Sequence, residues 1–252
     1  MSPRQKRRRY KRRARFGFIY KLLAAVAMIA AVVMGATVFF RVEEMVVQGN
    51  VRYNARQVID ASGIVQGDNL FGMNKFETAR QIRRQLPYVE GVNIRRGWPD
   101  TLIVTVMECQ AAARVNGEKG QWLISKSGKV LELARGTVKN VVRVDGLNAV
   151  QPEAGLPLVV REEQQARGSA LLLLLQALDN IELLDKVTYI DMTSPSRILM
   201  DLDERFVVKL PVVGDFDYLL GAMDKAVATL EEYETGTLDL TVKDYTVVFS
   251  PN

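Results

Sequence analysis

The sequence LPYVEGVNIRRGWPDTLIVTVME, residues 86–108, contains two extended segments joined by a turn. Residues 102–108 are rich in β-branched side chains, which favour strands. Residues 92–96 precede them across Gly97-Trp98-Pro99-Asp100, where glycine and proline are typical of a turn. Pro87 ends the helix expected before this stretch, because proline cannot continue a helix. We therefore predict a β-hairpin that ends near Glu108.

The residues before this hairpin predict one more strand and two helices. A β-rich segment at 42–47 stops at the turn residues Gly49-Asn50. Asn54 is a good helix N-cap, and Gly63 can adopt the left-handed backbone conformation that ends a helix. Asn74 resembles the start of a capping box for a second helix, with one apolar face formed by Phe76, Ala79, Ile82 and Leu86. The order β-α-α-β-β predicts a small sheet covered by two helices.

Four fragments of this region closely resemble the POTRA domain of the FtsQ/DivIB cell-division proteins. They are VQGN at 47–50, GDNLF at 67–71, LPYV at 86–89 and RGWPDTL at 96–102. Tyr88 replaces a common tryptophan, and Cys109-Gln110-Ala111 stands where the family often has Arg-x-Pro. We expect mostly turn and core roles, with Trp98-Pro99 shaping the hairpin and Leu70-Phe71 filling the sheet core. The fingerprint comprises Gly49, Asn50, Asn69, Leu70, Phe71, Arg96, Trp98 and Pro99.

The N-terminal 40 residues predict a membrane anchor. Residues 1–21 hold ten Lys/Arg and no acid, and residues 22–40 carry no charge. Nineteen helical residues span about 28 Å, close to the thickness of a bilayer core. A cleaved signal peptide or a buried soluble helix fits this long, uninterrupted apolar run less well. The positive-inside rule then places the tail in the cytoplasm and residues 41–252 outside; the basic residues that set this orientation include Arg7, Arg8, Arg9, Arg12 and Arg13.

The basic tail explains the overall charge of the chain. The net charge is +5, yet the 231 residues after the tail hold 24 Lys/Arg against 29 Asp/Glu, a balance of −5. We expect the tail to contact anionic lipid headgroups. No nucleic-acid partner is expected, because neither a folded nucleic-acid-binding motif nor an aromatic-rich segment accompanies the basic tail.

Residues 111–252 predict a mixed α/β unit that ends in a strand pair. Helices are expected at 162–181 and from Asp215 to Gly236, and the last strands at 238–242 and 245–249. The whole chain is therefore of the α+β class. Its expected parts are a tail (1–21), an anchor (22–40), a POTRA domain (41–110) and, by the resemblance, a "β domain" (111–252).

Catalysis is not expected. The chain has no histidine and one cysteine, Cys109, which removes His-based triads and the common Cys/His zinc sites. Lys126-Ser127-Gly128 imitates an element of penicillin-binding proteins, but no serine has lysine three residues later. Asp201 and Asp203 are expected on one side of a strand, as a solvated face rather than a glycosidase pair. We expect no cofactor, metal or small-molecule substrate.

The resemblance implies a non-catalytic divisome scaffold that recruits the FtsB/DivIC–FtsL pair at the septum. An open terminal strand can receive an extended partner segment through backbone hydrogen bonds. The alternatives are a POTRA-bearing envelope protein for secretion or polypeptide transport, and a wall-modifying enzyme. The residues expected at the docking edge are Val242, Tyr245, Val247, Val248, Phe249 and Ser250.

Overall fold

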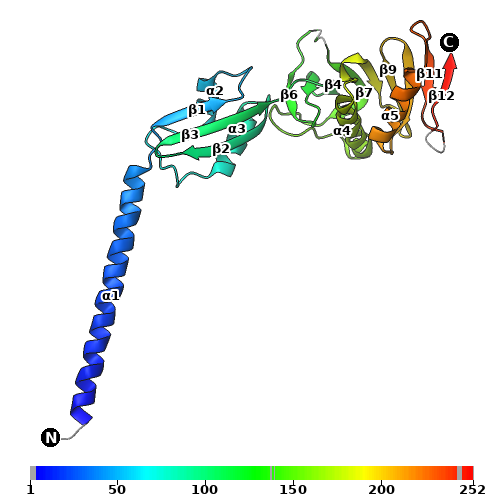
Figure 1. Cartoon of the computed structure of the whole chain (residues 1–252). Coiled ribbons are helices and arrows are strands. Elements are labelled where there is room, and N and C mark those ends of the chain that lie inside the picture. Colours follow the sequence, from blue (N-terminus) through cyan, green and yellow to red (C-terminus); the bar gives the residue numbers. More distant parts are fainter. Residues whose placement is uncertain (1–3, 137, 139, 243–245, 252) are drawn as a thin grey trace.

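The first element is a long helix that stands apart from the rest of the molecule (Figure 1). The computed structural model describes residues 4–136, 138, 140–242 and 246–251, and helix α1 spans Arg4–Phe39. The helix thus begins within the basic tail. Its stretch Phe18–Gly35 is long and apolar enough to cross a membrane, and no part of that stretch is buried against the protein. An N-terminal apolar helix of this kind fits a single-pass membrane protein.

The next five elements form a three-stranded sheet with two helices. Central strand β3 pairs in parallel with β1 and antiparallel with β2. Leu102, Val104 and Val106 alternate toward the buried face, as the period of a strand requires. The order β-α-α-β-β is confirmed, with β1 at Glu44–Gln48, α2 at Ala55–Ser62, α3 at Lys75–Gln85, β2 at Val89–Gly97 and β3 at Thr101–Glu108.

Both predicted N-cap residues are confirmed, but the reciprocal capping box is at the start of α2, whereas it was expected at Asn74 of α3. The Asn54 side chain accepts a hydrogen bond from the Gln57 amide and Gln57 returns one, while Gly63 closes α2 with a φ of 68°. Asn74 caps α3 by accepting from the amides of Phe76 and Glu77. The expected inward position of Phe76 is wrong, because its side chain is 84% exposed and Thr78 is buried instead.

A larger mixed sheet makes up the β-rich domain that follows. Its order, within the described residues, is β12-β11-β10-β9-β8-β7-β4-β5-β6. The apolar sides of α4 and α5 pack against it and form the main core with buried strand residues. The strands are β4 at Ala113–Gly117, β5 at Gly120–Ile124, β6 at Val130–Leu133, β7 at Val142–Ala149, β8 at Val187–Asp191, β9 at Arg197–Leu202, β10 at Phe206–Pro211, β11 at Gly236–Asp239 and β12 at Val248–Pro251; the helices are η1 at Glu162–Gln164, α4 at Gln165–Asn180, η2 at Leu184–Lys186 and α5 at Phe216–Val227.

Two expectations for this domain are wrong. Helix α5 ends at Val227, and Gly236 opens β11 rather than closing the helix. A Cβ on Gly236 would lie 2.3 Å from the Ser250 carbonyl oxygen, so glycine is needed where β12 passes close to β11. Asp203 lies in a turn after β9, with a φ of 56°, and does not share a strand face with Asp201.

The two folded units meet at the end of the three-stranded sheet that lies away from α1 (Figure 1). Tyr88 packs there with Leu123 and Leu131 in a small separate core. The Lys129 ammonium donates to the carbonyl oxygens of Arg83 and Val89, each at 2.7 Å. Burial lowers the pKa of Lys129, as expected for an ammonium enclosed at an interface.

Candidate functional site

The terminal strand β12 is the candidate partner-binding edge. It pairs antiparallel with β11 on one side and stands last in the sheet order of the described residues. Each strand at a sheet edge has backbone N–H and C=O groups that can pair with another chain. Residues 246–251 carry no charged side chain, so the usual charged protection of an edge is missing over the described part of this segment.

The side chains of β12 alternate between two environments. The Phe249 ring packs edge-on against Phe206, with ring centroids 6.2 Å apart, and lies against the main core together with Val247. Val248 and Ser250 are exposed. Phe249 therefore anchors the strand, while Val248 and Ser250 are available to a partner on the other face of the sheet.

The other residues predicted for this edge are less closely associated with β12. Val242 is exposed and lies after β11, where the loop toward β12 begins. Tyr245 lies outside the described residues. In the same loop region, Asp239 accepts hydrogen bonds from the amide and hydroxyl of Thr241. Burial opposes ionisation of Asp239, but these bonds and the charges of Lys209 and Arg197 keep its pKa below the usual value.

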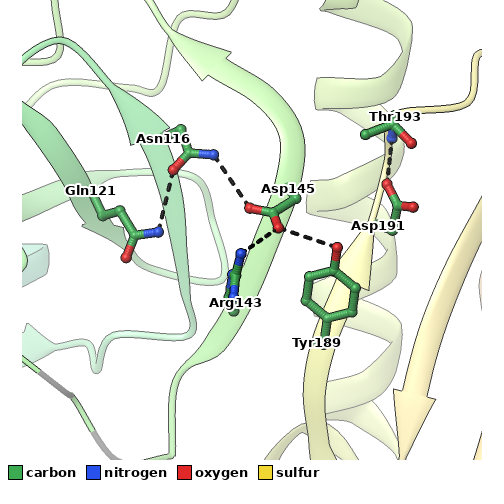
Figure 2. Close-up of polar contacts among 7 residues, drawn as sticks. All are labelled: Asn116, Gln121, Arg143, Asp145, Tyr189, Asp191 and Thr193. Carbon is green, nitrogen blue, oxygen red and sulfur yellow. Dashed lines mark hydrogen bonds and ion pairs between the residues drawn. The ribbon is translucent and has the colours of Figure 1, made fainter.

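A polar network lies farther along the same sheet (Figure 2). Asp145 accepts hydrogen bonds from Arg143 at 2.8 Å, Tyr189 at 3.2 Å and Asn116 at 3.3 Å. Burial, and then the charge of Asp145, raises the pKa of Tyr189. The network links β4, β7 and β8, and every oxygen of the carboxylate has a partner, so we assign it a structural role.

Nothing in the described residues assembles into a metal site. No group of three or more His, Cys, Asp or Glu side chains in that part of the chain is placed to hold an ion. Lys126 pairs with Asp179 of α4 on the surface, which gives the lysine of the Lys126-Ser127-Gly128 turn a structural partner.

The fingerprint residues of the three-stranded sheet hold its turns and its core. Gly49 has a φ of 77°, and a Cβ there would lie 2.3 Å from the Val106 carbonyl oxygen. Asn50 donates to the Tyr53 carbonyl oxygen at 2.9 Å. Asn69 accepts from the amides of Phe71 and Gly72 at 2.8 and 3.0 Å. The bonds of Asn50 and Asn69 are local and fix turns, whereas Gly49 allows the chain to pass close to the backbone of β3.

The remaining fingerprint residues divide between core and surface. Leu70 is buried, and Arg96 donates to its carbonyl oxygen. Phe71, Trp98 and Pro99 are exposed, although Phe71 was expected to fill the core with Leu70. The expectation for Phe71 is wrong, because its ring is 49% exposed and packs edge-on against Phe40 and Trp98 instead.

Residues 40–108 match the family model described as "POTRA domain, FtsQ-type". The chain carries an FtsQ-type POTRA domain. The match covers the β-α-α-β-β elements and all four sequence fragments on which the resemblance was based.

Curated relatives extend the similarity beyond the POTRA domain. The chain is 24% identical to the cell division protein DivIB of Clostridium acetobutylicum, over 75% of this chain and 73% of that protein. It is 25% identical to the cell division protein FtsQ of Corynebacterium glutamicum, over 67% of this chain and 79% of that protein. A DivIB of Clostridium botulinum is 30% identical over 50% of this chain and 49% of its own length. The resemblance to FtsQ/DivIB proteins is thus confirmed.

Sequence reasoning missed the residues that join the POTRA domain to the β-rich domain. The Arg52 guanidinium lies 3.7 Å from the centre of the Tyr88 ring and 3.5 Å from the Glu132 carboxylate. Tyr88 also donates to Glu132, and burial followed by this bond raises the pKa of Tyr88. Of these three residues only Tyr88 lies in one of the four resembling fragments, and Glu132 belongs to the distant strand β6, so the sequence alone did not indicate the contact.

Proposed function

We propose that the chain is a membrane-anchored, non-catalytic scaffold of bacterial cell division that receives a partner segment on β12. The observation that carries the proposal is the uncharged, open edge of β12 in a chain similar to FtsQ and DivIB proteins. An extended segment added to this edge gains backbone hydrogen bonds, and exposed Val248 and Ser250 provide contacts for its side chains.

The proposed partners are FtsB/DivIC-like and FtsL-like division proteins at the septum. The ten basic residues before the apolar span favour a cytoplasmic N-terminus, with anionic lipid at the tail. The POTRA and β-rich domains then face the extracytoplasmic side, in a type II arrangement. We propose that the tail covers residues 1–21, the anchor 22–40, the POTRA domain 41–110 and the β domain 111–252. The basic residues proposed to set the topology lie on α1, where the structure describes the backbone alone: Arg7, Arg8, Arg9, Arg12 and Arg13.

A lysine placed on the edge tests this proposal. Val248→Lys puts a charge where an added strand would pack, and lysine at an edge opposes strand addition. We expect binding of the purified FtsB/DivIC-like partner to weaken about tenfold or more, equivalent to about 1.4 kcal/mol. Fluorescence titration or surface plasmon resonance with the full chain in detergent measures the dissociation constant.

Val207→Lys is the matched control. Val207 is an exposed valine on β10, an inner strand of the same sheet, so the new charge alters the sheet surface without touching the edge. We expect this variant to bind as the unmodified chain does. Equal binding by Val248→Lys and the unmodified chain would remove β12 as the docking edge.

A further inference from the structure

An exposed group of aromatic rings lies on the POTRA domain directly after the apolar helix. Helix α1 ends at Phe39. The Phe40 carbonyl oxygen accepts from the Leu70 amide at 2.9 Å, and the Val42 amide donates to the Asp68 carbonyl oxygen at 2.8 Å. These bonds attach the loop before α3 to the first residues beyond the span.

The β2–β3 turn is attached to the same residues. The Glu43 amide donates to the Asp100 carbonyl oxygen at 2.9 Å. Three separate segments therefore converge where the chain leaves α1: the helix end, the 67–72 loop and the 97–100 turn. Figure 1 shows α1 joining the POTRA domain at one end, with the β-rich domain at the opposite end.

Four aromatic side chains gather at this point, which we call the aromatic tip: Phe39, Phe40, Phe71 and Trp98. The Phe40 ring lies 5.1 Å from both Phe71 and Trp98, and those two rings are 6.0 Å apart. Trp98 is nevertheless 73% exposed, Phe39 74% and Phe71 49%. The rings contact one another edge-on, and among the described residues Phe39 and Trp98 remain mostly uncovered, Phe71 about half uncovered and Phe40 partly buried.

Cationic groups border the aromatic tip. The Arg96 guanidinium lies 5.0 Å from the centre of the Phe71 ring and is held by its bond to the Leu70 carbonyl oxygen. Arg41 is exposed immediately after Phe40. Tryptophan at the level of the headgroups and arginine near the lipid phosphates are the usual composition of a membrane interface.

The position of the aromatic tip along the chain places it next to the membrane surface. The uncharged run 22–40 ends at Phe40, and Arg41 is the first charged residue after it. A tip that begins at Phe39 therefore lies at the boundary of the hydrocarbon core when α1 spans the bilayer. We propose that the aromatic tip inserts into the headgroup layer and holds the POTRA domain against the lipid surface.

This proposal rests on the membrane anchoring of the proposed function, but not on its partner or its orientation. It is tested with tryptophan fluorescence, because the chain has two tryptophans, Trp98 in the tip and Trp122 in the β-rich domain. The full chain is reconstituted in vesicles containing lipids brominated near the headgroup end of the acyl chain. Bromine quenches only rings that contact it.

The two single-tryptophan variants are matched reporters. In Trp122→Phe the remaining Trp98 is expected to be quenched several-fold more strongly than Trp122 in Trp98→Phe, and to be shielded from aqueous iodide. Trp122 is half-buried on β5, and its indole N–H donates to the Glu118 carbonyl oxygen at 3.0 Å. The β-rich domain that holds β5 lies at the opposite end of the POTRA domain from α1 (Figure 1). If Trp122→Phe folds poorly, the difference in quenching between the unmodified chain and Trp98→Phe gives the same answer.

Each outcome decides the proposal. Quenching of Trp98 by bromolipid supports insertion. Quenching of Trp98 by iodide but not by bromolipid overturns it, and the tip would then be a surface for a protein partner. Flotation of the same vesicles after an alkaline wash shows separately whether the chain is anchored, so loss of anchoring is not confused with a tip that stays in water.

Discussion

At the scale of single residues, Cys109 shows how the junction between the domains controls reactivity. Its half-buried thiol donates to the Tyr88 carbonyl oxygen at 3.4 Å. Burial, and then the charge of Glu90, raises the pKa of the Cys109 thiol to about 11. The thiolate that alkylating reagents attack is therefore scarce near neutral pH.

We expect iodoacetamide at about pH 8 to modify Cys109 roughly 100-fold more slowly in the folded chain than in urea, since the thiolate fraction falls by that factor. Mass spectrometry over time measures both rates. The raised pKa also means that folding favours the protonated thiol. Its contribution to stability is complete below the unfolded value of 9.0 and is lost as the pH rises through about 11. Similar alkylation rates in the two states would show that the thiol is not protected.

At the scale of elements, α2 is the clearest case of a helix specified locally. Asn54 and Gln57 exchange hydrogen bonds at its start, at 2.8 and 2.9 Å. Asn54→Ala leaves the Gln57 amide without its partner, and we expect the POTRA domain to lose about 1 kcal/mol of unfolding free energy. Urea denaturation of the full chain in detergent measures the loss. Asn54→Asp keeps the acceptor oxygen and should retain most of the stability; an equal loss in both variants would contradict the role of the cap.

At the scale of the whole molecule, the relation between the two domains depends on a close backbone contact at Gly155. Its φ is 89°, and a Cβ there would lie 2.5 Å from the Arg84 carbonyl oxygen at the end of α3. Lys129 reaches the neighbouring Arg83 carbonyl oxygen from the same side. The β-rich domain therefore covers the C-terminal end of a POTRA helix, and Lys129 supplies a donor to one of its last carbonyl groups.

Gly155→Ala should strain the backbone and separate the domains, whereas Gly67→Ala should only strain the backbone. Gly67 has a similar φ of 98° and no atom within 4 Å of an added Cβ. We expect Gly155→Ala to cost about 1–3 kcal/mol more than Gly67→Ala, because the overlapping atom belongs to backbone that must move. Urea denaturation of both variants measures the difference. Equal losses of unfolding free energy in the two variants would show that the junction between the domains accommodates the added methyl group without cost.

Much of the fold followed from the sequence because its signals are local. Caps at Asn54 and Asn74, the stop at Gly63 and the turn at Gly97–Asp100 involve neighbours along the chain, so residue type alone indicated them. The anchor followed from the length of an apolar run, and the POTRA resemblance from four ordered fragments.

Tertiary structure determined what depends on residues far apart in the sequence. Helical periodicity placed Phe76 inward, but the packing of α3 on the sheet buries Thr78 instead. Gly236 is suited to ending a helix, yet the close passage of β12 makes it part of a strand. The sequence by itself determined the anchor, the element order and the caps, because these depend on composition and near neighbours. The tertiary structure decided the inward role of Phe249, the junction at Lys129 and the exposed aromatic tip, because each requires segments that only folding brings together.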